Sequence, residues 1–247
     1  VCSSDLQEGV KGEGVETEKV SLKDFKNFKL IYKLLLFNCF FLYGAFFGIM
    51  DNANDLIKAR FGFDNSEAGN LVTIVYICSA IITPIFGFVI DKNGRRVTLM
   101  LIASIVFTLT HLFIAFCPDG TPQNPSYGII GGLLGIGLFY SVYASIFWPC
   151  VPLVVDDKVV GSAYGIITAL QNLMLTLIPL GTGFIHDQTV DYHNGYFWTE
   201  ITLAGLVVVG FFITLWMYFE DKKTGKRLEK PGSSRKALRS QASFVKP

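Results

Sequence analysis

Six long apolar runs, each separated from the next by a short polar joint, constrain this chain more than any other feature of its sequence. A helix needs about 20 apolar residues to cross the hydrocarbon core of a membrane, and each run is long enough. The runs do not alternate as barrel strands do, so helices are the remaining way to pair every backbone group within lipid. The sequence therefore predicts an all-α membrane protein whose spans are residues 34–57, 67–90, 97–117, 127–152, 162–186 and 196–219.

The composition agrees with a membrane protein and disfavours a nucleic-acid partner. Only 17% of the residues are charged and 51% are hydrophobic, whereas a soluble domain carries about 25% charged residues. The formal net charge is +1, which offers no general attraction for a polyanion. We therefore expect the lipid bilayer to surround this chain.

Lys and Arg residues are distributed very unevenly among the joints. From Lys19 onward, eighteen of them precede the first run, follow the last, or lie in the joints after the second and fourth runs, whereas Lys58 and Arg60 alone lie in the other joints. Because Lys and Arg are retained on the cytosolic side, both ends of the chain are predicted to be cytosolic. Residues 7–33 are then a cytosolic linker, residues 34–219 the six-helix domain, and residues 220–247 a basic tail that we expect to be disordered. Residues 1–6, "VCSSDL", read as a translated sequencing adapter, so we expect an artefact there and a truncated chain.

The joint after the second run has a specific pattern, "GFVIDKNGRR". Gly87 is expected to permit a close helix contact, and Gly94 a tight turn. Asp91 lies at the membrane boundary, where an unpaired carboxylate is costly, so it should have a cation or a helix N-terminus nearby. A plain positively charged loop is the alternative. The residues that make up the pattern are Gly87, Asp91, Lys92, Gly94, Arg95 and Arg96.

These six residues resemble the signature loop GxxxD[RK]xG[RK][RK] of the major facilitator superfamily. The resemblance implies a fold of two six-helix halves around a central cavity, with this loop acting in gating. The chain resembles the C-terminal half, so its first partner would be a missing N-terminal six-helix half. The stretches "SIFWPCVPLVV" and "GSAYGIITALQNL" are similar to those of the superfamily's lysosomal dipeptide transporters. That narrower resemblance implies a lysosomal or vacuolar membrane, with the plasma membrane as the alternative, and a glycosylated accessory membrane protein as a further partner.

Polar and aromatic residues recur at helical spacing inside the runs, where such residues usually face protein or water. Ser141, Ser145 and Trp148 share a face of the fourth run, and Asn38 and Asn52 align on the first. Pro149 should also leave a carbonyl near Ser145 without its helical donor. These faces predict a wet cavity, although helix packing through small residues is the competing explanation. The candidate substrate-binding residues are Trp148, Asn172, Tyr76, Ser145, Thr168 and Asn52.

The titratable residues within the runs are few. His111 is a lone His in the third run, and both a packing role and a proton relay fit it. Glu200 lies near the outer end of the sixth run, where we expect it to be hydrated. The sequence contains no HExxH, P-loop or nucleophile-elbow motif and predicts no catalytic residue, no metal and no cofactor.

The function favoured by these features is a secondary transporter that moves a small organic solute by alternating access. Dipeptides are the substrate that the resemblance implies. Another small solute, such as an organic anion or a sugar, remains an alternative, and so does a non-transporting receptor or assembly subunit of the same fold. A membrane-embedded enzyme is disfavoured because the spans hold no paired catalytic groups.

Overall fold

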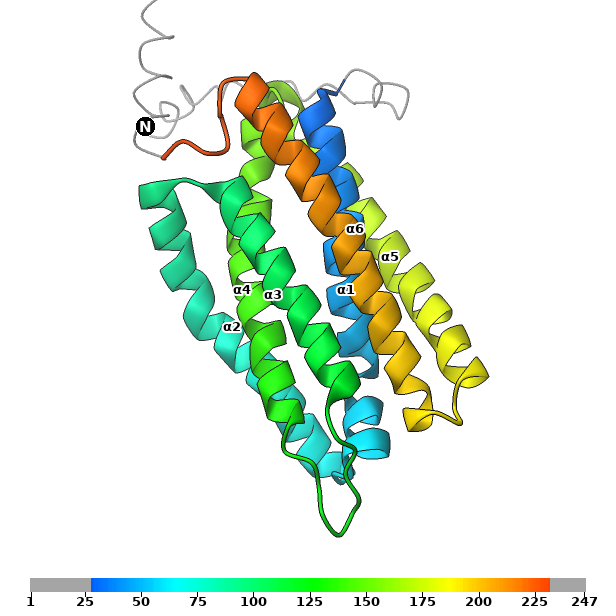
Figure 1. Ribbon diagram of the computed structural model, residues 1–247. Coiled ribbons are helices and arrows are strands. Elements are labelled where there is room, and N and C mark those ends of the chain that lie inside the picture. The colour runs from blue at the N-terminus through cyan, green and yellow to red at the C-terminus, as the bar shows by residue number, and fades with distance from the viewer. Residues whose placement is uncertain (1–27, 232–247) are drawn as a thin grey trace, which may run out of the picture.

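Six long helices make up nearly all of residues 28–231, the part of the chain that the computed structural model describes (Figure 1). Each of the six is long and apolar enough to cross a membrane, which confirms the predicted number of spans. The helices are α1 (Leu30–Phe61), α2 (Asn65–Asn93), α3 (Arg96–Phe116), α4 (Ile129–Val154), α5 (Val160–Gln188) and α6 (Tyr196–Lys223). Two single 3₁₀ turns, η2 (Asp157–Val159) and η3 (His193–Gly195), precede α5 and α6.

The helix boundaries extend beyond the apolar runs. Helix α1 begins at Leu30 and so takes in the last residues of the expected linker, and α6 continues to Lys223, within the expected tail. Helices pass beyond the hydrocarbon core because their backbone hydrogen bonds persist in the polar headgroup region. Residues 1–27 and 232–247 lie outside the described part of the chain, and with them the expected adapter artefact, most of the linker and most of the tail.

Helices α1 and α4 occupy the centre of the bundle. Helix α2 packs on α4, α5 packs on α1, and α3 and α6 pack together on one side of the central pair, in front of it in Figure 1. In the most apolar window of each helix, 67% of α1 and 61% of α4 is buried, against 11% of α2 and 17% of α5. The two outer helices α2 and α5 therefore leave most of their surface without a partner among the described residues.

Close approach of α3 and α4 explains a series of glycines in the fourth run. A Cβ atom at Gly135 would lie 2.5 Å from the hydroxyl oxygen of Thr110, and one at Gly132 would lie 2.5 Å from Ile114. Such distances exclude a side chain without local rearrangement. Gly132 and Gly135 therefore serve as packing contacts between α3 and α4.

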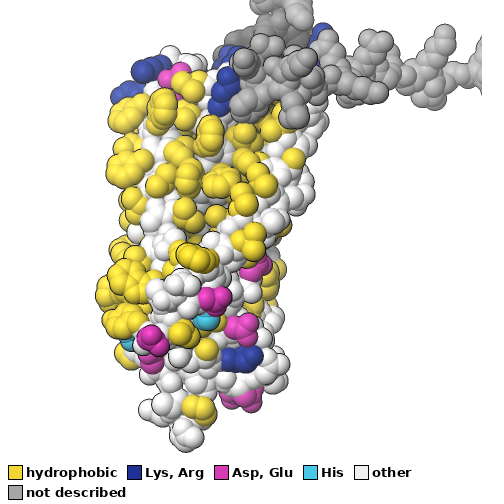
Figure 2. Space-filling view, turned by 90° about the vertical axis from the view of Figure 1, so that its right-hand side faces the viewer, with side chains coloured by type: hydrophobic (Ala, Val, Ile, Leu, Met, Phe, Trp, Pro, Cys, Tyr) yellow, Lys and Arg dark blue, Asp and Glu magenta, His cyan; other side chains and the backbone are white. Residues whose placement is uncertain are grey.

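The joints rich in Lys and Arg all lie at one end of the bundle. The start of α1, the α2–α3 joint, the α4–α5 joint and the end of α6 meet there (Figure 1). We call it the basic end, and the other the opposite end. Figure 2 shows apolar side chains covering the middle of one flank, Lys and Arg at the basic end, and acidic side chains with His toward the opposite end. The positive-inside rule predicts that the basic end is cytosolic.

Candidate functional site

The signature loop joins α2 to α3 through a tight turn at the basic end. Gly94 has a φ of 73° and Arg95 a φ of 55°. A Cβ atom at Gly94 would lie 2.4 Å from the backbone oxygen of Glu229, so glycine is required by both the backbone conformation and the contact. Asp91 accepts a hydrogen bond of 2.8 Å from the Arg96 guanidinium, which confirms that the carboxylate has a cation nearby. Arg96 is 1% exposed in this pair and Asp91 is 73% exposed.

The segment that follows α6, residues 224–231, folds back against this loop, and we call it the α6 strap. The Glu229 carboxylate accepts hydrogen bonds from the backbone N–H and the hydroxyl of Thr98, both at 3.0 Å. The Arg95 N–H donates to the backbone oxygen of Glu229. Leu228 is fully buried, and its N–H donates to the Asp221 carboxylate. The expectation that the tail is disordered is therefore wrong for the strap, because these contacts hold it.

Other residues of the loop pattern make fewer contacts within this chain. A Cβ atom at Gly87 would meet nothing within 4 Å, so the expected close contact at Gly87 is not made among the described residues. Lys92 and Arg95 are exposed, and neither side chain takes part in an ion pair among the described residues. Their charged groups are thus available to a surface outside this bundle.

A row of aromatic side chains crosses the bundle from α2 to α5. The rings of Trp148 and Tyr164 stack with centroids 6.0 Å apart. Trp148 also lies 6.3 Å from Tyr43, and Tyr43 lies 6.3 Å from Tyr140. One turn before Tyr140 on α4, Gly137 packs against Val75 and Cys78 of α2, which lie on either side of Tyr76 in the sequence. We call these five residues the aromatic band.

The Trp148 backbone lies where α4 lacks one helical hydrogen bond. Pro152 has no N–H, so the carbonyl four residues earlier, that of Trp148, loses its helical donor. The Tyr164 hydroxyl donates a hydrogen bond of 3.0 Å to that carbonyl and thereby joins α5 to α4. The sequence predicted that Pro149 leaves a carbonyl near Ser145 without its helical donor. The contact between helices forms instead at the Trp148 carbonyl, which Pro152 leaves without a donor.

Two further predicted residues lie on α5 beside the aromatic band. Thr168 and Asn172 follow Tyr164 at intervals of four residues, and both are exposed. None of the hydrogen bonds among the described residues uses the Asn172 side chain. Tyr76, across the bundle on α2, is 54% exposed. The accessible groups here are therefore aromatic rings, an amide and hydroxyls.

The structure places two predicted site residues elsewhere. Ser145 is 8% exposed, and its hydroxyl lies 2.6 Å from the Ser141 carbonyl and 3.1 Å from the Thr83 carbonyl of α2. Asn52 donates to the Gly48 carbonyl and approaches the Thr182 hydroxyl at 3.5 Å. It lies nine residues beyond Tyr43, about 13 Å along the axis of α1. Ser145 therefore joins α4 to α2, and Asn52 joins α1 to α5 away from the band.

Asn38 also lies inside the bundle rather than on a cavity face. It is fully buried, and its amide nitrogen donates to the Thr214 hydroxyl of α6 at 2.6 Å. Its amide oxygen accepts a hydrogen bond of 2.7 Å from the Tyr143 hydroxyl of α4. This network holds α1 between α4 and α6, so the expectation that Asn38 lines a cavity is wrong in this arrangement.

Tyr43 and Tyr140 were not among the predicted site residues. The sequence contained a partial indication of aromatic contacts between helices, because Tyr43 and Phe47 are four residues apart, as are Tyr143 and Phe147. Aromatic spacing of this kind is equally typical of a buried helix contact. Only the neighbouring helices distinguish half-buried Tyr140 from fully buried Tyr143.

The opposite end is held by Arg60 near the end of α1. Its guanidinium donates to the carbonyls of Ile114, Ala115 and Cys117 at 2.7–2.9 Å. It also forms an ion pair of 2.6 Å with Asp119, and the Arg60 side chain is 0% exposed in that pair. These carbonyls belong to the end of α3, whose last carbonyls have no helical donor. Arg60 therefore caps α3 and ties it to α1.

His111 and Glu200 form a buried pair between α3 and α6. His111 Nδ1 lies 2.7 Å from a Glu200 carboxylate oxygen, and the side chains are 0% and 1% exposed. The expectation that Glu200 is hydrated is wrong, because the packing of α6 against α3 excludes water from it. His111 Nε2 is buried and has no hydrogen-bond partner among the described residues. The same residues contain no group of three or more His, Cys, Asp or Glu that could hold a metal ion.

The chain matches the family described as Major Facilitator Superfamily over residues 36–247. It is also similar to proteins named lysosomal dipeptide transporter MFSD1. The Gallus gallus protein is 31% identical over 94% of this chain, the Homo sapiens protein 28% over 93%, and the Danio rerio protein 31% over 92%. The match covers 50%, 46% and 47% of those proteins, so the chain spans about half the length of the curated relatives it matches.

Proposed function

Because this chain belongs to the major facilitator superfamily, we propose that it forms one half of a twelve-helix transporter that moves dipeptides across the lysosomal membrane by alternating access. The observation that carries the proposal is the aromatic band together with exposed Asn172, on a side of the bundle where α2 and α5 lack partners. The other six-helix half would close this side and complete a cavity between the halves.

The chemistry of the band suits a small peptide. Aromatic faces contact apolar side chains and attract an ammonium group, while an amide such as Asn172 pairs with a peptide bond. Helix α2 carries no charged residue between Glu67 and Asp91, and α5 carries none between Lys158 and Asp187 apart from His186. This half would therefore contact the ammonium terminus through aromatic faces alone, and a charged partner for each terminus of a dipeptide would come from the other half.

The test is substitution of Trp148 by Phe in the twelve-helix protein. Phenylalanine keeps the stacking on Tyr164 and removes the indole N–H. We expect the half-saturation concentration for dipeptide uptake to rise about fivefold, which corresponds to the loss of one hydrogen bond of about 1 kcal/mol.

Trp216→Phe is the matched control, since Trp216 lies on α6 and is 55% exposed. Its side chain is expected to meet lipid, so its loss should leave uptake unchanged. Equal half-saturation in Trp148→Phe and the parent would remove Trp148 from the site. Failure of the parent itself to take up any dipeptide would refute the substrate and leave the transporter fold.

A further inference from the structure

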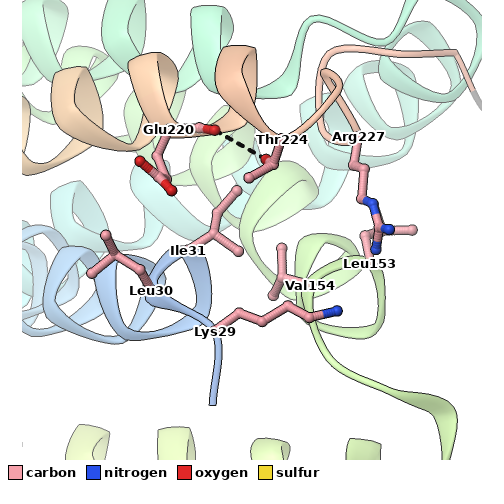
Figure 3. A pocket seen from close by; sticks show the side chains of 8 residues that line it. All are labelled: Lys29, Leu30, Ile31, Leu153, Val154, Glu220, Thr224 and Arg227. Atoms are coloured by element: carbon pink, nitrogen blue, oxygen red, sulfur yellow. Dashed lines mark hydrogen bonds between the residues drawn. The ribbon is translucent and has the colours of Figure 1, made fainter. Parts of the chain in front are cut away.

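A cavity of about 320 Å³ lies at the basic end, among the start of α1, the end of α4, the end of α6 and the α6 strap. This volume is within the range of small-ligand sites, which starts near 300 Å³. None of its lining residues belongs to the aromatic band or to the signature loop. The lining residues, drawn in Figure 3, are Lys29, Leu30, Ile31, Leu153, Val154, Glu220, Thr224 and Arg227.

The charged groups of the cavity are separated by sign. Figure 3 shows the Lys29 ammonium and the Arg227 guanidinium toward one side and the Glu220 carboxylate toward the other, beside Leu30 and Ile31. A ligand that matches this arrangement carries an anionic group at one end and a hydrogen-bond donor, preferably a cation, at the other. A head group with two anionic ends would be repelled by Glu220.

These charged groups are weakly engaged within the chain. Lys29 approaches Asp156 at 3.8 Å, with 56% and 83% of the two side chains exposed. Glu220 approaches Lys223 at 4.0 Å. Arg227 takes part in none of the ion pairs found among the described residues. Exposed pairs at such distances contribute at most about 1 kcal/mol, so a ligand can replace them at little cost.

The apolar walls of the cavity lie at the ends of two membrane-spanning helices, α1 and α4. Leu30, Ile31, Leu153 and Val154 supply the apolar surface. Helix ends with basic side chains mark the depth of the phospholipid head groups. The ligand is therefore expected to be amphipathic and to reach the cavity from the membrane.

We propose that this cavity binds the head group of phosphatidylethanolamine. The phosphate faces Lys29 and Arg227, the primary ammonium faces Glu220, and the glycerol and first acyl carbons lie against the apolar walls. Phosphatidylglycerol has the phosphate but no ammonium. Phosphatidylcholine has a cation that cannot donate a hydrogen bond, so the geometry selects the ethanolamine head group over both.

The experiment measures lipid binding to the purified twelve-helix protein by native mass spectrometry. Phosphatidylethanolamine, phosphatidylglycerol, phosphatidylcholine and soluble phosphoethanolamine are titrated separately. We expect phosphatidylethanolamine to bind several-fold more tightly than the other two lipids, and soluble phosphoethanolamine to bind far more weakly because it gains nothing from the walls. Equal binding of the three lipids would overturn the proposal. Binding of phosphoethanolamine as tight as that of the lipid would overturn the lipid as the source of the phosphate.

Substitutions then assign the two ends of the head group. Arg227→Gln should weaken phosphatidylethanolamine and phosphatidylglycerol about tenfold each, as for the loss of one charge-assisted hydrogen bond. Glu220→Gln should weaken phosphatidylethanolamine alone. Lys29→Gln tests the phosphate side a second time, in case Arg227→Gln disturbs the strap. Lys158→Gln removes an exposed cation at the same end and is the control, so it should leave the binding of every lipid unchanged. Unchanged lipid binding in both Arg227→Gln and Lys29→Gln would refute the site.

Discussion

The two ends of this helix bundle are closed in physically different ways. At the opposite end, the fully buried Arg60 guanidinium donates to three carbonyls and to Asp119. At the basic end, Asp91 is 73% exposed in its pair with Arg96, and Glu229 reaches Thr98 from a strap outside the bundle. The Arg96 guanidinium at the basic end is also buried, but among the described residues it donates only to the exposed Asp91 carboxylate and to the Lys230 carbonyl of the strap. Opening the opposite end removes four partners from buried Arg60, which costs several kcal/mol. We therefore expect motion within this half at the basic end.

The first experiment on the two ends establishes which of them is cytosolic. Its expected result is all or none, because the cysteine added at one end is labelled and the cysteine added at the other is not. Lys226→Cys lies in the strap, and Gln123→Cys lies in the joint between α3 and α4; both positions are exposed. An impermeant maleimide added outside sealed vesicles whose cytosolic face is on the inside should label Gln123→Cys alone, because the positive-inside rule places the basic end in the cytosol. Labelling of the parent cysteines gives the background. Labelling of both added cysteines would refute six spans, and labelling of Lys226→Cys alone would reverse the orientation.

The largest expected change in stability is that of Arg60→Ala. Removing the guanidinium leaves Asp119 and three carbonyls without their donor, at a cost of about 3–5 kcal/mol. Thermal unfolding of the purified protein measures it. Lys58→Ala, two residues earlier, removes only a partly exposed pair with Asp55 at 3.2 Å and should cost less than about 1 kcal/mol. Similar melting temperatures for the two variants would contradict the view that the opposite end is the rigid one.

Asp91→Ala should lower transport more than stability. The pair with Arg96 holds the signature loop in one state, and its loss should shift the balance between states by on the order of 1–3 kcal/mol. Uptake at equal surface expression measures this. Asp156→Ala removes an equally exposed carboxylate at the same end, outside the loop, and should transport as the parent does. Uptake kinetics that are the same in Asp91→Ala and the parent would exclude a gating role for this pair.

Glu229→Gln is expected to have the smallest effect of the series. The amide retains one acceptor for Thr98 but loses the charge that strengthens both hydrogen bonds, a cost of about 1–2 kcal/mol. Hydrogen exchange at residues 94–98 should accelerate roughly tenfold while exchange at residues 114–119 stays constant. Asp191→Asn, exposed in the α5–α6 joint, serves as the control. Unaltered exchange at residues 94–98 would show that the strap does not stabilise the loop.

The candidate site was only partly visible in the sequence. Trp148 and Tyr76 were predicted and belong to the aromatic band, and Asn172 lies beside it. Ser145 has the same helical spacing as Trp148, yet it packs against α2, because a shared face does not specify which neighbour covers each turn. The Glu229 contact joins residues 131 positions apart, and the His111–Glu200 contact joins residues 89 apart. No local sequence pattern predicts contacts between residues so far apart in the chain.

The sequence by itself determined the six spans and the tight turn at Gly94. Both depend on local free energies, namely the transfer of about 20 residues into lipid and the conformational freedom of glycine. The tertiary structure alone decided that Glu200 is buried beside His111, that Asn38 lies inside the bundle, and that the strap holds the signature loop. Inside a membrane nearly every helix face is apolar, so packing and hydrogen bonds between distant segments determine which residues meet.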